Sequence, residues 1–495
     1  MRVLLLRPPD PRIERFSLWM PLGLASLASA IRERHEVTIL DAPLLGLDVE
    51  AATKRVLEIR PDVLGVSLLT LSLYPAGMLC RRVKEVAPEV VTVVGGPHPS
   101  GDPHGTLPLC EAWDYAFQGE AEQGFSLFLD RLEAAGSPGR DRSSHPVLEP
   151  SPRPALIRKK KEDWTRDIPG LIRRVNGGVE ITPAAFASDL DALPHPAWDL
   201  LDLPAYPRHS FFFMGRQPNA HLYATRGCPS SCVFCGIRGV SGPGFRTRSV
   251  ESVLHEVHIL QARYGVQTLM FVDDNLTADR DYALALFDAL AGLPSPVHWI
   301  PIHGLRLDTL DEELVRAMDR SGCLLFYAGI ESGSPRILER MGKGTTLEEI
   351  ESKVRLVRRV SRIQVCGYFV LGFPGETRED ALRSIRFARK LQLDRALFLP
   401  NLLSPGSEQW RRLVTSGRMP ALTLEDFEDP IGLGYRLIWE FLAEKDGLSP
   451  RELRRLFEKA YASFYLRPGP LSRLPFQVSP RGVRDAARWV SRYFA

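Results

Sequence analysis

The first 135 residues alternate short apolar, β-branched runs with longer segments in which apolar residues recur every three or four positions. The short runs predict strands, and the longer segments predict amphipathic helices. Strands and helices that alternate at this spacing are typical of a doubly wound parallel sheet. We therefore predict a Rossmann-like α/β domain over residues 1–135, with strands at 3–6, 36–40, 62–67 and 90–94 and helices at 22–34, 48–59 and 76–86.

The pattern weakens over residues 136–207. Residues 135–154 are rich in Gly, Pro, Ser and Arg, which is typical of a linker. Short runs on either side of Asn176-Gly177 predict a small hairpin, because this pair favours a tight turn. Prolines between 190 and 207 predict a second extended connection.

A new series of alternating strands and helices begins near His221. Six such units predict a partial (β/α)6 TIM-type barrel over residues 208–425, followed by a helical C-terminal domain over 426–495. The predicted barrel strands are 221–225, 268–273, 298–303, 324–330, 364–371 and 396–400, and the helices are 250–264, 281–291, 311–321, 347–360 and 378–390.

Composition narrows the class of protein. The 495 residues include 63 Lys and Arg against 60 Asp and Glu, which disfavours wholesale binding to nucleic acid or to a membrane surface. No apolar run approaches the length of a membrane-spanning helix. The seven cysteines are too sparse for a disulfide scaffold. We expect a cytoplasmic protein.

Three cysteines, Cys228, Cys232 and Cys235, lie within eight residues after the first barrel strand. Loops at this end of a barrel carry its chemistry. Three thiolates at this spacing can bind a [4Fe-4S] cluster whose fourth iron has no protein ligand. A zinc knuckle is the alternative, but a closed zinc site needs a fourth ligand, and no nearby Cys or His supplies the usual second pair. We expect the four isolated cysteines in the core: Cys80, Cys110, Cys323 and Cys366.

The Cys-x3-Cys-x2-Cys loop, with an aromatic residue before its last cysteine, resembles the signature of radical S-adenosylmethionine enzymes. The resemblance implies that S-adenosylmethionine chelates the open iron. It is then cleaved to methionine and a 5′-deoxyadenosyl radical, which abstracts hydrogen. The resemblance also implies that Phe234 contacts the adenine.

Segments after the later barrel strands resemble the S-adenosylmethionine contacts of the same enzymes. The segment 271–275 lacks the family's usual two glycines and glutamate, whereas 367–376 resembles its adenine-side glycine motif. Each segment also has an ordinary interpretation as a helix cap or a turn, but their regular placement after successive strands favours binding. The expected contacts are Phe234, Asp273, Asp274, Asn275, Arg306, Glu331, Ser332, Gly372, Gly375 and Glu376. No catalytic side chain is predicted.

The amino-terminal domain resembles a cobalamin-binding domain, and its fusion to a radical barrel resembles the cobalamin-dependent radical S-adenosylmethionine enzymes. Glycines after the fourth strand allow the backbone to approach a flat macrocycle or its nucleotide tail. The Asp-x-His-x-x-Gly loop that supplies a lower cobalt ligand in many cobalamin proteins is absent, so His98 is expected near the tail. The expected cobalamin contacts are Ser67, Thr70, Gly95, Gly96, Pro97, His98, Gly119 and Glu120.

These resemblances predict a cobalamin-dependent radical enzyme that transfers a methyl group from methylcobalamin to an unactivated carbon of a small molecule or natural product. The alternative is cyclisation, ring contraction or oxidation with the same cofactors, as in anaerobic porphyrin cyclases. Methylthiotransfer to transfer RNA is disfavoured, because it needs a second cluster and the amino-terminal half holds only Cys80 and Cys110. A non-catalytic cobalamin or redox sensor is a further alternative. The expected partners are the substrate and a reductant such as flavodoxin or ferredoxin.

Overall fold

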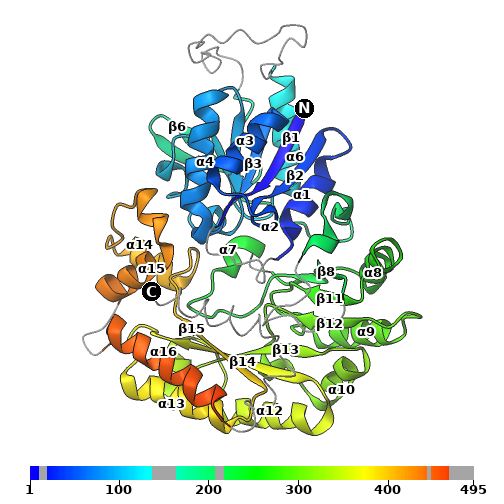
Figure 1. Cartoon of the computed structure of the whole chain (residues 1–495), viewed down its shortest axis with the longest axis vertical. Helices are drawn as coiled ribbons and strands as arrows, with labels where there is room; N and C mark the ends of the chain where they lie inside the picture. The colour runs from blue at the N-terminus through cyan, green and yellow to red at the C-terminus, as the bar shows by residue number, and fades with distance from the viewer. Residues whose placement is uncertain (11–18, 137–162, 207–216, 243, 443–446, 468–495) are drawn as a thin grey trace.

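The computed structural model describes residues 1–10, 19–136, 163–206, 217–242, 244–442 and 447–467. Two α/β bodies follow one another along the long axis of the molecule, the amino-terminal domain at one end and the barrel at the other (Figure 1). None of the described helices combines the length and the apolar composition needed to cross a bilayer.

The amino-terminal domain is the predicted doubly wound sheet. Its parallel strands run in the order β2-β1-β3-β4-β5, so the strand order reverses beside β1, where folds of this type bind ligands. Helices α1 and α6 cover one face, and α3 and α4 cover the other. The strands are β1 (Arg2–Arg7), β2 (Glu36–Asp41), β3 (Val63–Ser67), β4 (Val91–Gly95) and β5 (Tyr115–Phe117). The helices are α1 (Leu22–Ile31), α2 (Ala42–Leu45), α3 (Val49–Ile59), α4 (Leu73–Val86), α5 (Pro97–Gly101) and α6 (Glu122–Ala134).

The predicted hairpin forms as β6 (Leu171–Val175) and β7 (Gly178–Ile181). It pairs antiparallel with β5 and completes a seven-stranded sheet in the described part of the chain. This part of the expected linker therefore belongs to the first domain, whereas residues 137–162 lie outside the described residues.

The second body is the predicted six-unit partial barrel. Its strands form two parallel sheets, β12-β11-β8 and β13-β14-β15, which isolated bridges join between β12 and β13. The strands are β8 (Asn219–Leu222), β11 (Thr268–Phe271), β12 (His298–Pro301), β13 (Leu325–Glu331), β14 (Gln364–Leu371) and β15 (Arg395–Pro400), with a short ribbon of β9 (Thr225–Arg226) and β10 (Arg246–Thr247). The helices are α7 (Ile237–Ser241), α8 (Val250–Tyr264), α9 (Arg280–Ala291), α10 (Glu312–Arg320), α11 (Pro335–Arg340), α12 (Leu347–Val360), α13 (Arg378–Lys390) and α14 (Glu408–Thr415).

The helices after the barrel are divided between the two bodies. Apolar residues of α15 (Pro430–Leu437) and the preceding turn join the core of the amino-terminal domain. In contrast, α16 (Pro450–Tyr465) packs against α13 and β15 of the barrel. The predicted helical tail is therefore shared by two cores, and residues 468–495 lie outside the described residues.

Candidate functional site

The amino-terminal domain and the barrel meet at the loops that follow their strands. Helix α5, which follows β4, packs against α7, which follows the three clustered cysteines, and Figure 1 shows α7 between the two bodies. Glycines permit this approach, because a Cβ on Gly239 would lie 3.0 Å from the carbonyl oxygen of Ser100. The segment after β4 that is expected to bind cobalamin (residues 95–98) and the loop with the three cysteines (residues 228–235, the cluster loop) are thus neighbours.

Ion pairs reinforce the junction. Arg246 forms hydrogen bonds of 3.0 and 2.8 Å with the two carboxylate oxygens of Glu120, and Arg226 donates to Glu122 at 2.8 Å. All four side chains are at most 14% exposed. The carboxylate of Glu120, an expected cobalamin contact, is therefore bound to the barrel, which indicates that it positions the two domains.

The cluster loop begins where two carboxylates hold the backbone that follows β8. One oxygen of Asp273 accepts hydrogen bonds from the Ala224 amide at 3.0 Å and from the Thr225 amide and hydroxyl at 2.5 and 2.7 Å. Asp274 accepts from the Gly227 amide at 2.9 Å. Burial raises the pKa of Asp273 to about 7. These two expected S-adenosylmethionine contacts hold the backbone directly before Cys228.

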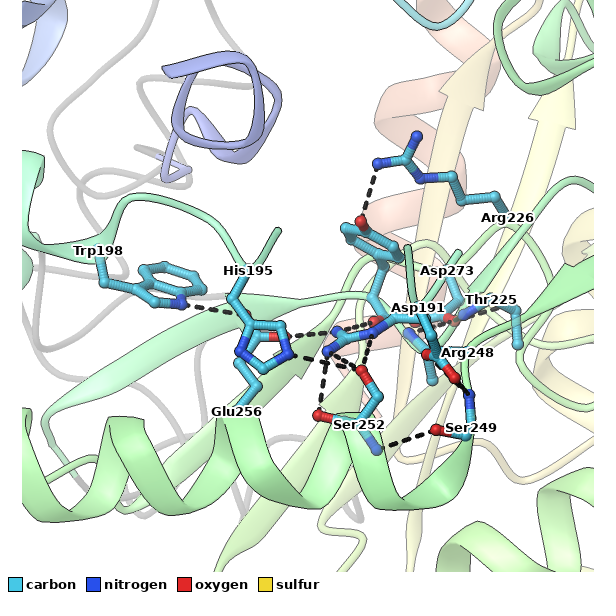
Figure 2. Close-up of polar contacts among 12 residues, drawn as sticks. Asp191, His195, Trp198, Thr225, Arg226, Arg248, Ser249, Ser252, Glu256 and Asp273 are labelled. Carbon is cyan, nitrogen blue, oxygen red and sulfur yellow. Dashed lines mark hydrogen bonds and ion pairs between the residues drawn. The ribbon is translucent and has the colours of Figure 1, made fainter. Parts of the chain in front are cut away.

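A second buried network supports the same segment from α8 (Figure 2). Arg248 lies between Glu256 and the carbonyl oxygen of Tyr223, to which it donates at 3.0 Å. Trp198 donates to the other oxygen of Glu256 at 3.0 Å. Breaking such a pair leaves a buried charge uncompensated, so the network holds the cluster loop against the barrel wall.

The three clustered cysteines are free thiols with access to solvent, since Cys228 and Cys232 are half-buried and Cys235 is exposed. In the described residues, no three His, Cys, Asp or Glu side chains stand close enough to bind a single metal ion. Three thiolates on one loop match the three corners of an iron–sulfur cube that a protein holds when the fourth iron is open. The donor set therefore fits a [4Fe-4S] cluster with one open iron.

Two cations lie beside the cluster loop. The guanidinium of Arg306 reaches 3.9 Å from Cys232 Sγ and donates to the carbonyl oxygen of Lys343 at 2.7 Å. The Lys343 ammonium donates to Glu331 Oε1 at 2.8 Å, and both side chains are buried. Glu331, an expected S-adenosylmethionine contact with a φ of +64°, is therefore held by a buried ion pair. Sequence reasoning missed Lys343, whose partner lies twelve residues away.

The loop after β12 adds His303, another residue that sequence reasoning missed, although it lies three residues before Arg306. Its side chain is exposed. Partial removal from water lowers the pKa of His303, while the negative charge of Asp274 opposes this effect. His303 therefore stands near the carboxylate that accepts from the Gly227 amide.

Other expected S-adenosylmethionine contacts shape their own loops. Glu376 accepts from the Gly372 amide at 2.5 Å, and burial raises its pKa to about 8. The Gly375 carbonyl accepts from Arg336 at 2.8 Å.

The buried Ser332 hydroxyl bonds to Ser384, and Asn275 accepts from Thr277 at 3.4 Å. Phe234 packs with Ile337, Met341, Val370 and Phe373.

The expected cobalamin residues gather around the ends of β3 and β4. Thr70 Oγ1 lies 3.0 Å from Nδ1 of the buried His98, whose Nε2 has no partner among the described residues. Burial lowers the pKa of His98 to about 3. Gly96, with φ +106°, faces the Leu68 backbone and Ser67 Oγ, and Gly95 and Pro97 flank it. The Gly119 amide donates to Ser100 Oγ at 2.9 Å.

Exposed apolar side chains complete this edge. Leu69 and Trp19, in the loops after β3 and β1, are 43% and 36% exposed. Large apolar residues and an unpartnered buried imidazole nitrogen fit a ligand that combines an apolar macrocycle with polar edges. The residues at the edge therefore fit cobalamin.

Comparisons with known proteins agree with this arrangement. The model of the radical SAM superfamily matches residues 222–388, and the model of the B12 binding domain matches residues 12–129. Along its whole length, the chain is 30% identical to the uncharacterized methyltransferase PH0819 of Pyrococcus horikoshii, of which it covers 99%. It is 29% identical to cytidylyl-2-hydroxyethylphosphonate methyltransferase of Streptomyces wedmorensis, over 85% of this chain and 81% of that protein.

Two further matches extend the comparison. The anaerobic magnesium-protoporphyrin IX monomethyl ester cyclase of Synechocystis sp. is 26% identical over 72% of this chain and 66% of that protein. The solved structure of the cobalamin-dependent S-adenosylmethionine radical enzyme OxsB, with aqua-cobalamin and S-adenosylmethionine bound, has a TM-score of 0.66. It is 16% identical and covers 99% of this chain and 75% of that one, a likeness that concerns the fold.

The matched domains and the full-length relative confirm the expected fold and the three expected cofactors, a [4Fe-4S] cluster, S-adenosylmethionine and cobalamin. The chain belongs to the cobalamin-dependent radical S-adenosylmethionine enzymes.

Proposed function

We propose that the protein transfers a methyl group to an unactivated carbon of a small-molecule substrate. When bound, the cluster and S-adenosylmethionine supply a 5′-deoxyadenosyl radical, and cobalamin supplies the methyl group. The observation that carries the proposal is the direct packing of α5 on α7. It supports methyl transfer because the radical and the methyl donor must act on one substrate at one interface.

The chain's own residues have three tasks in this proposal. Asp273 and Asp274 fix the cluster loop, Arg246 and Glu120 hold the domains in register, and the exposed Leu69 and Trp19 would supply apolar contacts to cobalamin. Together they orient the reacting groups and exclude water. We also propose that the residues predicted from the sequence contact S-adenosylmethionine and cobalamin when these are bound.

The names of two relatives, PH0819 and the phosphonate methyltransferase, also support methyl transfer. The test uses anaerobically reconstituted protein loaded with cobalamin, a low-potential reductant and S-adenosylmethionine with a deuterated methyl group. Candidate substrates include the cytidylylated phosphonate named for the Streptomyces relative and other small-molecule intermediates. Mass spectrometry is expected to find the labelled methyl group on carbon in one product.

Radical cyclisation or oxidation is the second candidate, favoured by the similarity to the Synechocystis cyclase. The same assay separates the two reactions. A product that forms together with 5′-deoxyadenosine but carries no label would contradict methyl transfer and favour the cyclase type of reaction.

A further inference from the structure

His221 on β8 faces the interior of the barrel. In the register of the parallel sheet it lies beside Met270 of β11, which in turn lies beside Ile300 of β12. Met270 and Ile300 belong to an apolar cluster with residues of β13, β14 and β15. The neighbours of His221 on its own strand, Ala220 and Leu222, instead join the core between the sheet and its helices. Because side chains alternate along a strand, His221 shares the interior row with Met270 and Ile300.

The imidazole of His221 presents one hydrogen-bond donor. Its Nδ1 accepts from the backbone amide of Met20 at 3.0 Å, so the proton of the neutral ring is on Nε2. The residue is 4% exposed, and burial lowers the pKa of His221 to about 3, which keeps the ring neutral at physiological pH. Within the described ranges, no group accepts a hydrogen bond from Nε2. Buried donors are seldom left without a partner, so a bound ligand is the expected acceptor.

Trp19 places this donor beside the residues proposed to bind cobalamin. Its indole ring packs against the ring of His221, with centroids 5.6 Å apart and planes tilted by 36°. On β11, the expected S-adenosylmethionine contacts begin only at Asp273, three residues beyond Met270. The donor of His221 therefore lies outside the segment expected to bind S-adenosylmethionine and next to the methyl-donor side, which leaves it for the substrate.

The barrel interior offers apolar and aromatic surface to such a ligand. Tyr327 and Tyr368 stack with ring centroids 5.1 Å apart, and Tyr368 is only partly buried. The cations Arg306 and Lys343 are each paired with a carboxylate, at 2.6 and 2.8 Å. A buried anionic group would therefore find no spare cation in these two residues, and burying an unpaired charge is costly. Such an interior suits an uncharged group with one hydrogen-bond acceptor.

From this combination we infer that His221 is a substrate-binding residue, and that the part of the substrate it holds is an uncharged aromatic or conjugated group with a carbonyl-type acceptor. The Nε2 proton forms a hydrogen bond with this acceptor, orients the substrate and stays on the imidazole. The inference rests on the proposed function, since it gives a chemical class to the substrate of that reaction.

Binding of small probes tests this inference without turnover. Saturation-transfer NMR, on protein reconstituted with the cluster and cobalamin, measures dissociation constants for acetophenone, which has a carbonyl acceptor, ethylbenzene, which has none, and benzoate, which is charged. Acetophenone is expected to bind more tightly than benzoate. In His221→Asn the side-chain oxygen still accepts from the Met20 amide, but its N–H is too short to reach the ligand. Acetophenone should therefore bind this variant about three- to tenfold more weakly, and ethylbenzene should bind it as it binds the parent.

Two further variants make the test specific. His221→Gln carries its amide N–H near the position of Nε2, so it should recover most of the acetophenone binding. His258→Asn, at an exposed histidine of α8, should leave all three dissociation constants unchanged.

Four results would overturn the inference: no acetophenone binding, equal acetophenone binding by the parent and His221→Asn, an equal loss of ethylbenzene binding, or tighter binding of benzoate. No methyl group is transferred in this assay, so any of these results leaves the proposed reaction standing. Conversely, the labelled-methyl assay can fail while binding that depends on His221 persists.

Discussion

Lys343 places a buried positive charge beside the cluster loop. Burial opposes this charge, but Glu331 and Cys232 outweigh burial and raise the pKa of Lys343. A cation near the cluster stabilises its reduced form, which carries the additional negative charge. The ammonium of Lys343 is therefore expected to raise the reduction potential of the bound cluster.

The double variant Lys343→Met and Glu331→Gln removes the cation without leaving a buried carboxylate unpaired. Loss of the Glu331 charge offsets part of the effect, but Lys343 acts on Cys232 more strongly than Glu331 does. The reduction potential of the cluster should therefore become more negative by on the order of 20 mV, which corresponds to about 0.5 kcal/mol for one electron. Redox titration followed by electron paramagnetic resonance measures it. Lys390→Met, which breaks an exposed pair with Glu351, is the control that should leave the potential unchanged.

Glu376 predicts a pH dependence of stability. Its pKa is about 8 in the folded protein against 4.5 for the ordinary carboxyl group. Between these values the unfolded chain releases a proton that the folded chain keeps, so the free energy of unfolding falls as the pH rises from 5 to 8. The substitution Glu376→Gln keeps an acceptor for the Gly372 amide but leaves no proton to lose.

The thermal midpoint of Glu376→Gln should therefore decline less than that of the parent between pH 5 and 8, with similar values below pH 5. Scanning calorimetry at several pH values measures the difference, on the order of 4 kcal/mol at pH 8. The exposed Glu379→Gln on the same segment should follow the parent. Parallel pH curves for the parent and Glu376→Gln would contradict the assignment.

For single residues, the sequence predicts those whose role depends on local spacing and misses those whose partners lie far away along the chain. The spacing of Cys228, Cys232 and Cys235 is local, so it is visible along the chain. The partners of Glu331 and Glu120 are Lys343 and Arg246, which only the fold brings within 2.8 Å of them. Carboxylates expected to bind cofactors are therefore found in ion pairs.

At the scale of elements, Asp273, just after β11, holds the backbone that follows β8. The variant Asp273→Ala removes an acceptor of three hydrogen bonds, with an expected cost of about 2–4 kcal/mol, and frees the segment before Cys228. Iron bound after anaerobic reconstitution should fall clearly below the parental content. Asp273→Asn keeps one carbonyl oxygen in place, so it should bind nearly normal iron. Equal iron content in the parent, Asp273→Ala and Asp273→Asn would contradict the role of Asp273 in holding the cluster loop.

The elements themselves follow closely from the pattern of apolar positions. Predicted helices 250–264 and 347–360 coincide with α8 and α12, because a helix with one apolar face has a local signature. The hairpin was predicted as part of a linker, since local pattern identifies two strands but not the edge that they join. For the same reason, apolar residues in α15 and α16 do not reveal that they belong to different cores.

At the scale of the molecule, the Arg246–Glu120 pair couples the two bodies. Breaking a pair that is 14% and 10% exposed leaves a largely buried charge. We expect the parent to unfold in one thermal transition and Arg246→Glu to unfold in two. The same variant should retain cobalamin poorly, because the ligand is proposed to lie between the two bodies.

The reciprocal exchange, Arg246→Glu with Glu120→Arg, restores opposite charges at the junction. It should recover at least half of the coupling and of the bound cobalamin, measured by calorimetry and by absorbance after gel filtration. A matched exchange of the exposed pair Arg32 and Asp199 should change neither quantity. If Arg246→Glu alone unfolds in one transition and keeps its cobalamin, α5 and α7 hold the domains without this pair, and packing of their glycines is sufficient for the junction.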